Sequence, residues 1–159
     1  MTVSRPLLFL DVDGVLNPFG GGCPPGYVAH DVFPGEEPVL VNLDHGEWIR
    51  ELMETFDVAW ATAWNDNANE LLAPLLGIPP LPVVTMPVAP FPPSDKVPLV
   101  AARAGQRPAA WIDDAHPAEA MAWCESRAVP TILIGVNAAS GLTREHVDRA
   151  IEWVSSLDG

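Results

Sequence analysis

Apolar and polar residues recur with two different periods along the chain, which predicts strands and helices in alternation. Four consecutive apolar residues, from Leu7 to Leu10, lead directly into Asp11. Short apolar runs bounded by turn residues are typical of buried strands, whereas apolar residues spaced three and four apart indicate helices. We expect strands at residues 7–11, 57–62, 83–85, 109–113 and 131–134.

Helices are expected between and after these strands. The first opens at Asp44, with Glu47 three residues later as in a capping box. Ser94 and Thr143 are expected to cap two later helices. The expected helices cover residues 44–56, 65–76, 94–104, 117–127 and 143–157.

Two segments are rich in turn-forming residues. Residues 17–41 contain repeated glycine and proline and are expected to form a flap, with a small hairpin whose strands lie at 27–30 and 39–41. Residues 78–98 are dense in proline, which removes backbone donors and leaves room only for the short strand at 83–85. Neither segment is long enough to hold a large cap with its own core.

The order of elements predicts an α/β fold. Strands that alternate with helices form a mostly parallel sheet through right-handed crossovers. We therefore expect a single domain over residues 1–159, with a three-layer, Rossmann-like sheet and helices on both faces. No repeat or linker interrupts it.

Composition excludes several classes of protein. The chain has 159 residues, and 48% of them are hydrophobic, which suits one domain with a full core. The net charge of −13 opposes attraction to nucleic acid or to an anionic membrane. No apolar run has the length of a membrane span, and no cleavable leader is evident, so we expect a soluble, cytoplasmic protein. Cys23 and Cys124 are expected to be unpaired thiols.

Polar side chains follow three of the expected strands. Asp11 and Asp13 follow the first, Thr62 ends the second, and Asp113 and Asp114 end the fourth. Each feature alone has an ordinary explanation, since aspartate forms turns and caps helices and threonine is common in strands. Together they fall where ligands bind in open parallel sheets. Four converging carboxylates require a cation, and oxygen ligands favour Mg²⁺.

Lys96 is the single lysine beside seven arginines. Lysine is a compact charge on a thin stem, whereas arginine is a broad planar fork. A chance surface lysine would explain the observation equally well. Near a metal site, however, such a lysine would bind an anion that the metal also holds, and a phosphoryl group fits that description.

The order of these residues resembles the four motifs of the haloacid dehalogenase-like (HAD) phosphohydrolases. The matching stretches are "FLDVDGVLN", "VAWATAW", "SDKVP" and "AAWIDDA", and the resemblance spans roughly residues 7 to 135. The stretch "ATAWNDNAN" is also similar, less specifically, to small HAD domains of RNA-repair proteins. Receiver domains and Toprim domains use similar residues. Receiver domains have an aspartate where Thr62 ends the middle strand and place their lysine last, and Toprim domains have a glutamate strand before their Asp-x-Asp, whereas no such strand precedes Asp11.

The resemblance assigns roles to the two acids of the first motif. Asp11 would attack phosphorus and form an aspartyl phosphate. Asp13 would protonate the leaving oxygen and then activate water. Because dehalogenases of this family lack the second aspartate, Asp13 implies a phosphatase.

The resemblance also implies a magnesium site and a phosphate site. Mg²⁺ would be held by the Asp11 side chain, the Asp13 backbone carbonyl and Asp113, with Asp114 either binding the ion or supporting its ligands. Thr62 would donate a hydrogen bond to a phosphoryl oxygen, and Lys96 would offset negative charge.

Further candidates follow Thr62. Trp64 and Asn65 are candidate substrate-binding residues, since a tryptophan can stack on a ring. The competing interpretation is that Trp64 packs under the proline-rich segment. For His116, helix capping or a surface position is expected before a role in binding phosphate. Trp60 and Trp111 are expected in the core.

The sequence thus predicts a Mg²⁺-dependent phosphatase that acts through an aspartyl phosphate. The alternative is a non-catalytic phosphate- or metal-binding module that acts through a protein partner. Without a cap, water is excluded only if the substrate covers the site. This favours a phosphorylated macromolecule, either a nucleic-acid end or a protein, or else cover from a partner subunit.

Overall fold

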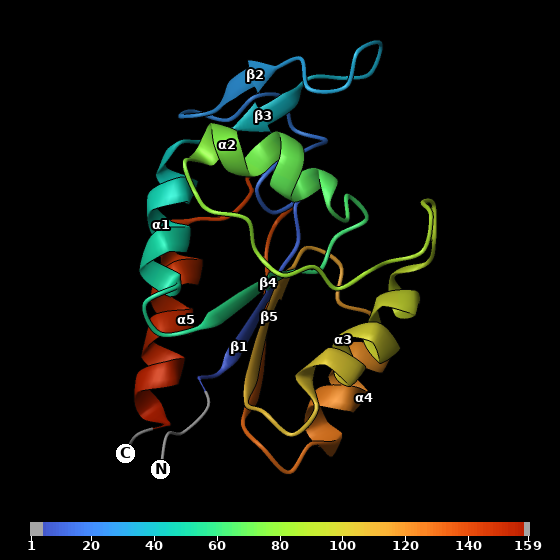
Figure 1. The fold of residues 1–159 in the computed structure, drawn as a ribbon, viewed down its shortest axis with the longest axis vertical. Coiled ribbons are helices and arrows are strands. Elements are labelled where there is room, and N and C mark those ends of the chain that lie inside the picture. The colour runs from blue at the N-terminus through green and yellow to red at the C-terminus, as the bar shows by residue number, and fades with distance from the viewer. Residues whose placement is uncertain (1–4, 158–159) are drawn as a thin grey trace.

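Four parallel strands form the central sheet of the computed structural model, which describes residues 5–157 (Figure 1). The strands are β1 (Leu7–Leu10), β4 (Asp57–Trp60), β5 (Ala109–Asp113) and β6 (Thr131–Gly135). Their order across the sheet is β4-β1-β5-β6. Leu7 of β1 aligns with Asp57 on one side and Ala109 on the other, so β1 is central and is flanked by β4 and β5.

Helices cover both faces of this sheet. They are α1 (Asp44–Leu52), α2 (Ala73–Leu76), α3 (Lys96–Ala104), α4 (Ala118–Ser126) and α5 (Arg144–Ser156). Helices α1 and α5 lie on one face and α3 and α4 on the other (Figure 1). The predicted α/β class, with a mostly parallel sheet flanked by helices, is confirmed.

Side chains along β1 point alternately to the two faces of the sheet, so the hydrophobic core has two parts. Leu8 and Leu10 pack with Ile49 and Val147 on the side of α1 and α5. Leu7 and Phe9 face the other way and pack with residues of α3 and β5. Every residue of β1 is buried. Because both faces of the strand are covered, polar groups can follow it only at its carboxyl end, where Asp11 lies.

A hairpin lies beyond the carboxyl ends of the sheet strands (Figure 1). Its strands, β2 (Val28–His30) and β3 (Val39–Val41), are antiparallel, as predicted. The Tyr27 hydroxyl donates a hydrogen bond to the Ser140 carbonyl at 3.2 Å, which ties the hairpin to the loop after β6. The backbone N–H of Leu40 donates to Asn17 Oδ1 at 2.9 Å, which ties it to the loop after β1.

Several element boundaries differ from prediction. Helix α1 ends at Leu52 rather than at residue 56. No capping box forms at Asp44, because the Asn42 side chain accepts the backbone N–H of Asp44 at 3.0 Å and opens the helix. Ser94 does not cap α3, since it lies inside a 3₁₀ turn (Pro93–Asp95) that precedes the helix. Only Thr143 behaves as predicted, in a capping box with His146.

Strand β4 ends at Trp60 rather than at residue 62. Two larger differences concern the segments after this strand. The helix predicted at 65–76 begins at Ala68, as a π-helix (Ala68–Leu72) that continues into α2. The strand predicted at 83–85 reduces to one parallel bridge between Val83 and Trp60. Proline on both sides of this bridge explains why no longer ladder forms.

Within residues 5–157, no helix combines the length and the apolar character needed to cross a membrane.

Candidate active site

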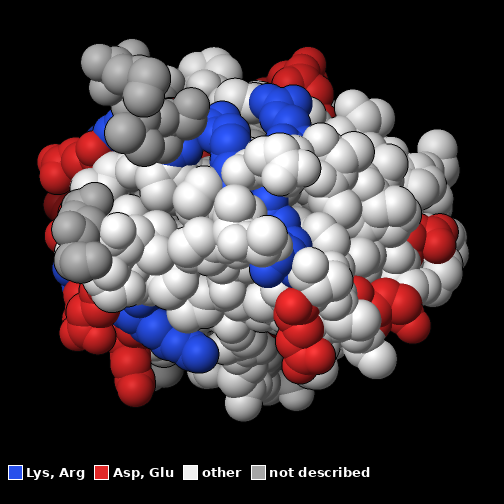
Figure 2. Space-filling model, turned by 90° about the horizontal axis from the view of Figure 1, so that it is seen from below, with Lys and Arg blue, Asp and Glu red and all other residues white. Residues whose placement is uncertain are grey.

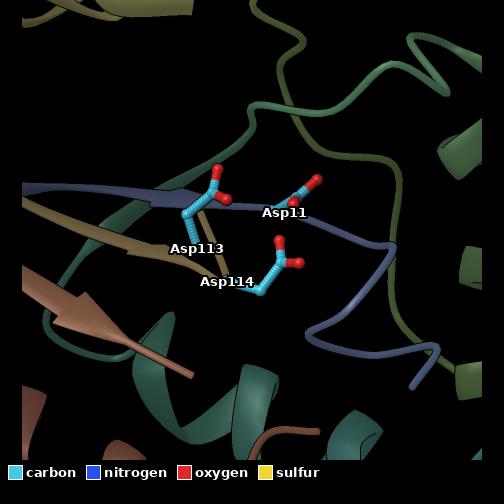
Figure 3. A group of neighbouring side chains, drawn as sticks. All are labelled: Asp11, Asp113 and Asp114. Carbon is cyan, nitrogen blue, oxygen red and sulfur yellow. The ribbon is translucent and has the colours of Figure 1, made fainter. Parts of the chain in front are cut away.

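Three aspartates converge at the carboxyl ends of β1 and β5. Asp11 directly follows β1, Asp113 is the last residue of β5, and Asp114 comes next. One carboxylate oxygen from each lies within 4.8 Å of the others. Figure 3 shows the three carboxylates grouped at this edge of the sheet. The sequence predicted this convergence, because neighbouring parallel strands end at the same edge of a sheet.

Lys96 lies among the ends of three neighbouring strands. Its Nζ is 3.2 Å from Asp11 Oδ1 and 2.8 Å from Asp113 Oδ2. It also donates to the backbone carbonyl of Ala61, just after β4, at 3.0 Å. An ammonium has three N–H donors, so each donor has one acceptor. The residue is only 9% exposed, so the space around the ammonium is narrow.

Burial and neighbouring charges shift the ionisation of this group. Burial, followed by the charge of Asp113, raises the pKa of Asp11 well above its usual value. Burial acts the same way on Asp113, but Lys96 outweighs it and lowers the pKa of Asp113. Burial alone would lower the pKa of Lys96, yet the charges of Asp11 and Asp113 raise it. The lysine is therefore held in its charged form between two carboxylates.

Gly14 makes room for Asp114. A Cβ at position 14 would overlap the carboxylate of Asp114, and the backbone there has φ +82°, which disfavours other residues. The sequence indicated a sharp turn at Gly14. The structure adds a second reason for glycine, because the acidic group of another loop lies against its Cα.

Asp13 stands apart from the three clustered carboxylates and is exposed. Its Oδ1 accepts a hydrogen bond from Asn17 Nδ2 at 3.0 Å. Its Oδ2 accepts one from Trp64 Nε1 at 3.1 Å. Because each oxygen has its own donor, the carboxylate is fixed in direction.

Trp64 and Asn17 were not predicted in this role. Trp64 is 9% exposed and its ring packs edge-on against Phe33, with ring centroids 5.0 Å apart. The Trp64 side chain therefore orients the Asp13 carboxylate through its hydrogen bond, and its buried ring offers no open face on which a substrate could stack. In the sequence, the one feature that pointed to a contact between Asn17 and Asp13 is their separation of four residues.

Thr62 and Asn65 lie after β4 in different environments. The Thr62 side chain is buried, lines the cavity at the site and accepts the backbone N–H of Trp64 at 3.2 Å. Its hydroxyl hydrogen remains available to a ligand in the cavity. Asn65 instead bonds to the backbone of Met86, accepting its N–H at 2.7 Å and donating to its carbonyl at 3.2 Å. Asn65 thus holds the proline-rich segment in place and does not line the cavity.

The site opens into a cavity of about 200 Å³. Its charged lining consists of Asp11, Asp13, Asp113, Asp114 and Lys96. Phe19 and Phe91, which sequence reasoning missed, line the same cavity. His116 does not line it. Its ring packs edge-on against the buried Trp111, with ring centroids 4.9 Å apart.

The carboxylate cluster has the chemistry of a magnesium site. Asp11, Asp113 and Asp114 supply hard oxygen donors and negative charge, which are the properties that Mg²⁺ selects. Burial and, after it, the charge of Asp113 raise the pKa of Asp11, and Lys96 does not fully offset them. A divalent cation held by these three residues would favour the charged form of Asp11.

Comparisons with known proteins support the fold alone. No model of a known protein family matches the chain, and no curated protein is similar to it in sequence. A crystal structure of a hypothetical protein from Xanthomonas campestris is similar in fold, with a TM-score of 0.52 and 18% sequence identity. The similarity covers 98% of this chain and 85% of that one.

Magnesium should stabilise the folded protein through this cluster. A ligand present at 100 times its dissociation constant adds about 2.7 kcal/mol, or an increase in Tm of about 5–10 °C for a chain of this size. We expect that increase by calorimetry when Mg²⁺ is added, and its loss in Asp114→Asn. The exposed Asp31 makes no hydrogen bond among the described residues, so Asp31→Asn is the matched control and should respond like wild type. An equal increase in all three proteins would mean that the ion binds elsewhere.

Proposed function

We propose that the protein is a Mg²⁺-dependent phosphatase that hydrolyses a phosphomonoester through an aspartyl phosphate on Asp11. The observation that carries this proposal is the pairing of two differently held carboxylates in one cavity. Asp11 is buried beside Lys96, while Asp13 is exposed and oriented by two donors. Lys96 favours the charged form of Asp11 that a nucleophile needs, and a cation bound at Asp11 would act in the same direction.

In the first half-reaction, an oxygen of Asp11 forms a bond to phosphorus and the bond from phosphorus to the leaving oxygen breaks. Asp11 Oδ1 already has the backbone N–H of Val12 at 2.8 Å and Lys96 at 3.2 Å. Among the described residues no donor lies on Oδ2, so Oδ2 is the oxygen free to attack. Asp13, protonated at this stage, gives its proton to the leaving oxygen.

In the second half-reaction, water replaces the leaving group. The Asp13 carboxylate takes a proton from water, the water oxygen bonds to phosphorus, and the bond between phosphorus and Asp11 breaks. Phosphate leaves, and Asp13 is again protonated for the next cycle. One residue therefore serves as acid and then as base, which requires its two oxygens to keep their direction throughout.

The other residues stabilise charge on the transferring group. Mg²⁺, bound by Asp11, Asp113 and Asp114, would neutralise phosphoryl oxygens. The Thr62 hydroxyl donates a hydrogen bond to one of these oxygens from the cavity wall. Lys96 keeps Asp11 aligned and offsets the charge that accumulates beside it. Such positioning and charge stabilisation account for most catalysis of phosphoryl transfer.

The resemblance of the motifs to HAD phosphohydrolases supports the same reaction. Residues from all four matching stretches line the same cavity: Asp11 with Asp13, Thr62, Lys96, and Asp113 with Asp114. The structural neighbour carries no functional description and adds support for the fold only.

Asp11→Asn tests the proposal directly. The amide keeps the size of the side chain but cannot act as the nucleophile, so phosphate release should fall by about 10⁴-fold or more. The measurement is release from 4-nitrophenyl phosphate with Mg²⁺, with near-ultraviolet circular dichroism as a check of folding. Asp31→Asn, a charge change on an exposed side chain, should retain full activity. If the wild-type protein releases no phosphate from any ester, the non-catalytic alternative replaces the proposal.

Lys96→Arg should lose nearly as much activity as Lys96→Ala. The Lys96 ammonium lies 2.8–3.2 Å from three acceptors, and the residue is only 9% exposed. A planar guanidinium cannot direct three donors to the same three acceptors. We expect both variants to lower kcat/KM by about 100-fold or more. Recovery of most of the activity with arginine would show that any cation suffices at this position.

Trp64→Phe should lower kcat/KM, which reports the first half-reaction, only for substrates whose leaving oxygen needs a proton. The change removes the N–H that fixes Asp13 Oδ2 and keeps an aromatic ring in place. We expect kcat/KM to fall about 10-fold or more for an alkyl phosphate, and little for acetyl phosphate, whose leaving group needs no proton.

Trp60→Phe is the matched control for Trp64→Phe. Trp60 Nε1 donates to Asn69 at 2.7 Å, so the control also loses a buried indole hydrogen bond, but one away from the cavity. Equal losses on both substrates in Trp64→Phe would indicate general damage to the site instead of a positioning role.

A further inference from the structure

Two phenylalanines face the cavity from different parts of the chain. Phe19 comes from the loop after β1 and is 53% exposed. Phe91 comes from the proline-rich segment and packs partly against the core beneath α3. Together they add aromatic surface to a cavity whose lining also holds five charged side chains.

Both aromatic side chains stand on fixed backbone. The Phe19 backbone N–H donates to the Ala138 carbonyl at 2.8 Å, which ties this loop to the one after β6. Phe91 is flanked by Pro90, Pro92 and Pro93, whose rings restrict the backbone. The backbone at both residues is therefore held in place beside the cavity.

A second hollow adjoins the site at Phe19. It has a volume of about 370 Å³ and lies between the loop after β1 and the hairpin. Its lining is mainly apolar, with Pro18, Pro38 and Leu40 among its residues, and Glu37 is its only charged side chain. A leaving group that covers Phe19 would continue into this hollow.

Neither hollow offers a positive charge for a second anionic group. Among their lining residues Lys96 is the only cation, and all three of its donors are engaged. Together with a divalent ion it would supply three positive charges against the carboxylates of Asp11, Asp113 and Asp114 alone, which leaves no surplus for a second anionic group. Arg5, Arg103 and Arg107 line a different hollow, at the opposite end of the sheet beside the first residues of β1 and β4. Figure 2 views that end and shows its blue basic side chains.

We propose that the substrate is a monophosphate ester with an aromatic ring close to its single phosphoryl group and no second anionic group. The ring lies against Phe19 and Phe91, and the rest of the leaving group enters the apolar hollow beside Phe19. This inference rests on the proposed phosphatase function. It disfavours a nucleic-acid end, because every further phosphate would meet carboxylates without a cation to pair with.

The first test compares benzyl phosphate with ethyl phosphate, whose leaving alcohols have similar acidity. We expect kcat/KM to favour the benzyl ester by about 10-fold or more. Phe19→Ala and Phe91→Ala should each reduce that preference to about threefold or less. Met121→Ala, on the outer side of α4 and 54% exposed, removes an equally exposed apolar side chain away from the cavity and should keep the full preference. Equal rates for the two esters in wild type would overturn the inference.

The second test addresses charge. 4-Carbamoylbenzyl and 4-carboxybenzyl phosphate have nearly the same shape and differ by one negative charge. We expect the neutral amide to be preferred about fivefold or more at low salt, with the difference shrinking as salt is added. A preference for the carboxylate would show that an unrecognised cation serves the hollow.

A binding measurement separates this inference from the proposed reaction. Benzylphosphonate and ethylphosphonate cannot be hydrolysed, and their dissociation constants in the presence of Mg²⁺ can be measured by calorimetry. Tighter binding of the benzyl compound, lost in Phe19→Ala, supports the aromatic subsite even if no ester is hydrolysed. If esters are hydrolysed but the two phosphonates bind equally, the phosphatase stands and the aromatic subsite is wrong.

Discussion

The ammonium of Lys96 holds together the ends of three strands that would otherwise repel one another. Two buried carboxylates and a backbone carbonyl meet at this single charge, and each comes from a different strand end. Without it, Asp11 and Asp113 would lie uncompensated in a region from which water is largely excluded, which is among the most costly arrangements in a protein. The positions of Asp11, of Asp113 and of the cavity floor therefore depend on one side chain at the start of α3.

The parts of the site that follow from topology were predictable from the sequence. Asp11, Thr62 and Asp113 follow strands, and the strands of a parallel sheet end at one edge, so their convergence needed no knowledge of packing. The hydrogen bond from Trp64 to Asp13 spans 51 residues and depends on how the chain turns after β4. Nothing in the local sequence specifies that turn. For the same reason the cap predicted at the start of α1 was wrong, although the helix begins at Asp44 as predicted, because the Asn42 side chain accepts the backbone N–H of Asp44.

Two segments that lack regular structure give the site its shape. The loop after β1 carries Asn17, whose side chain joins Asp13 to the hairpin through Leu40. The proline-rich segment is held by Asn65 and ends in the turn that leads into Lys96. The acid and the ammonium are thus positioned by short connections to rigid neighbours. The molecule can keep an open site with ordered walls even though no separate cap covers it within the described residues.

The close approach of Asp114 to Gly14 has a consequence for how such chains are compared. One methyl group at position 14 would displace an acidic side chain that belongs to a loop 100 residues away, while every acid and the lysine stayed in the sequence. A residue with no functional group thus carries as much information about the site as those with one. Two relatives that share all the charged positions would differ in the geometry of the acidic cluster if only one kept this glycine. A comparison of charged residues alone would therefore group proteins whose acidic clusters differ in shape.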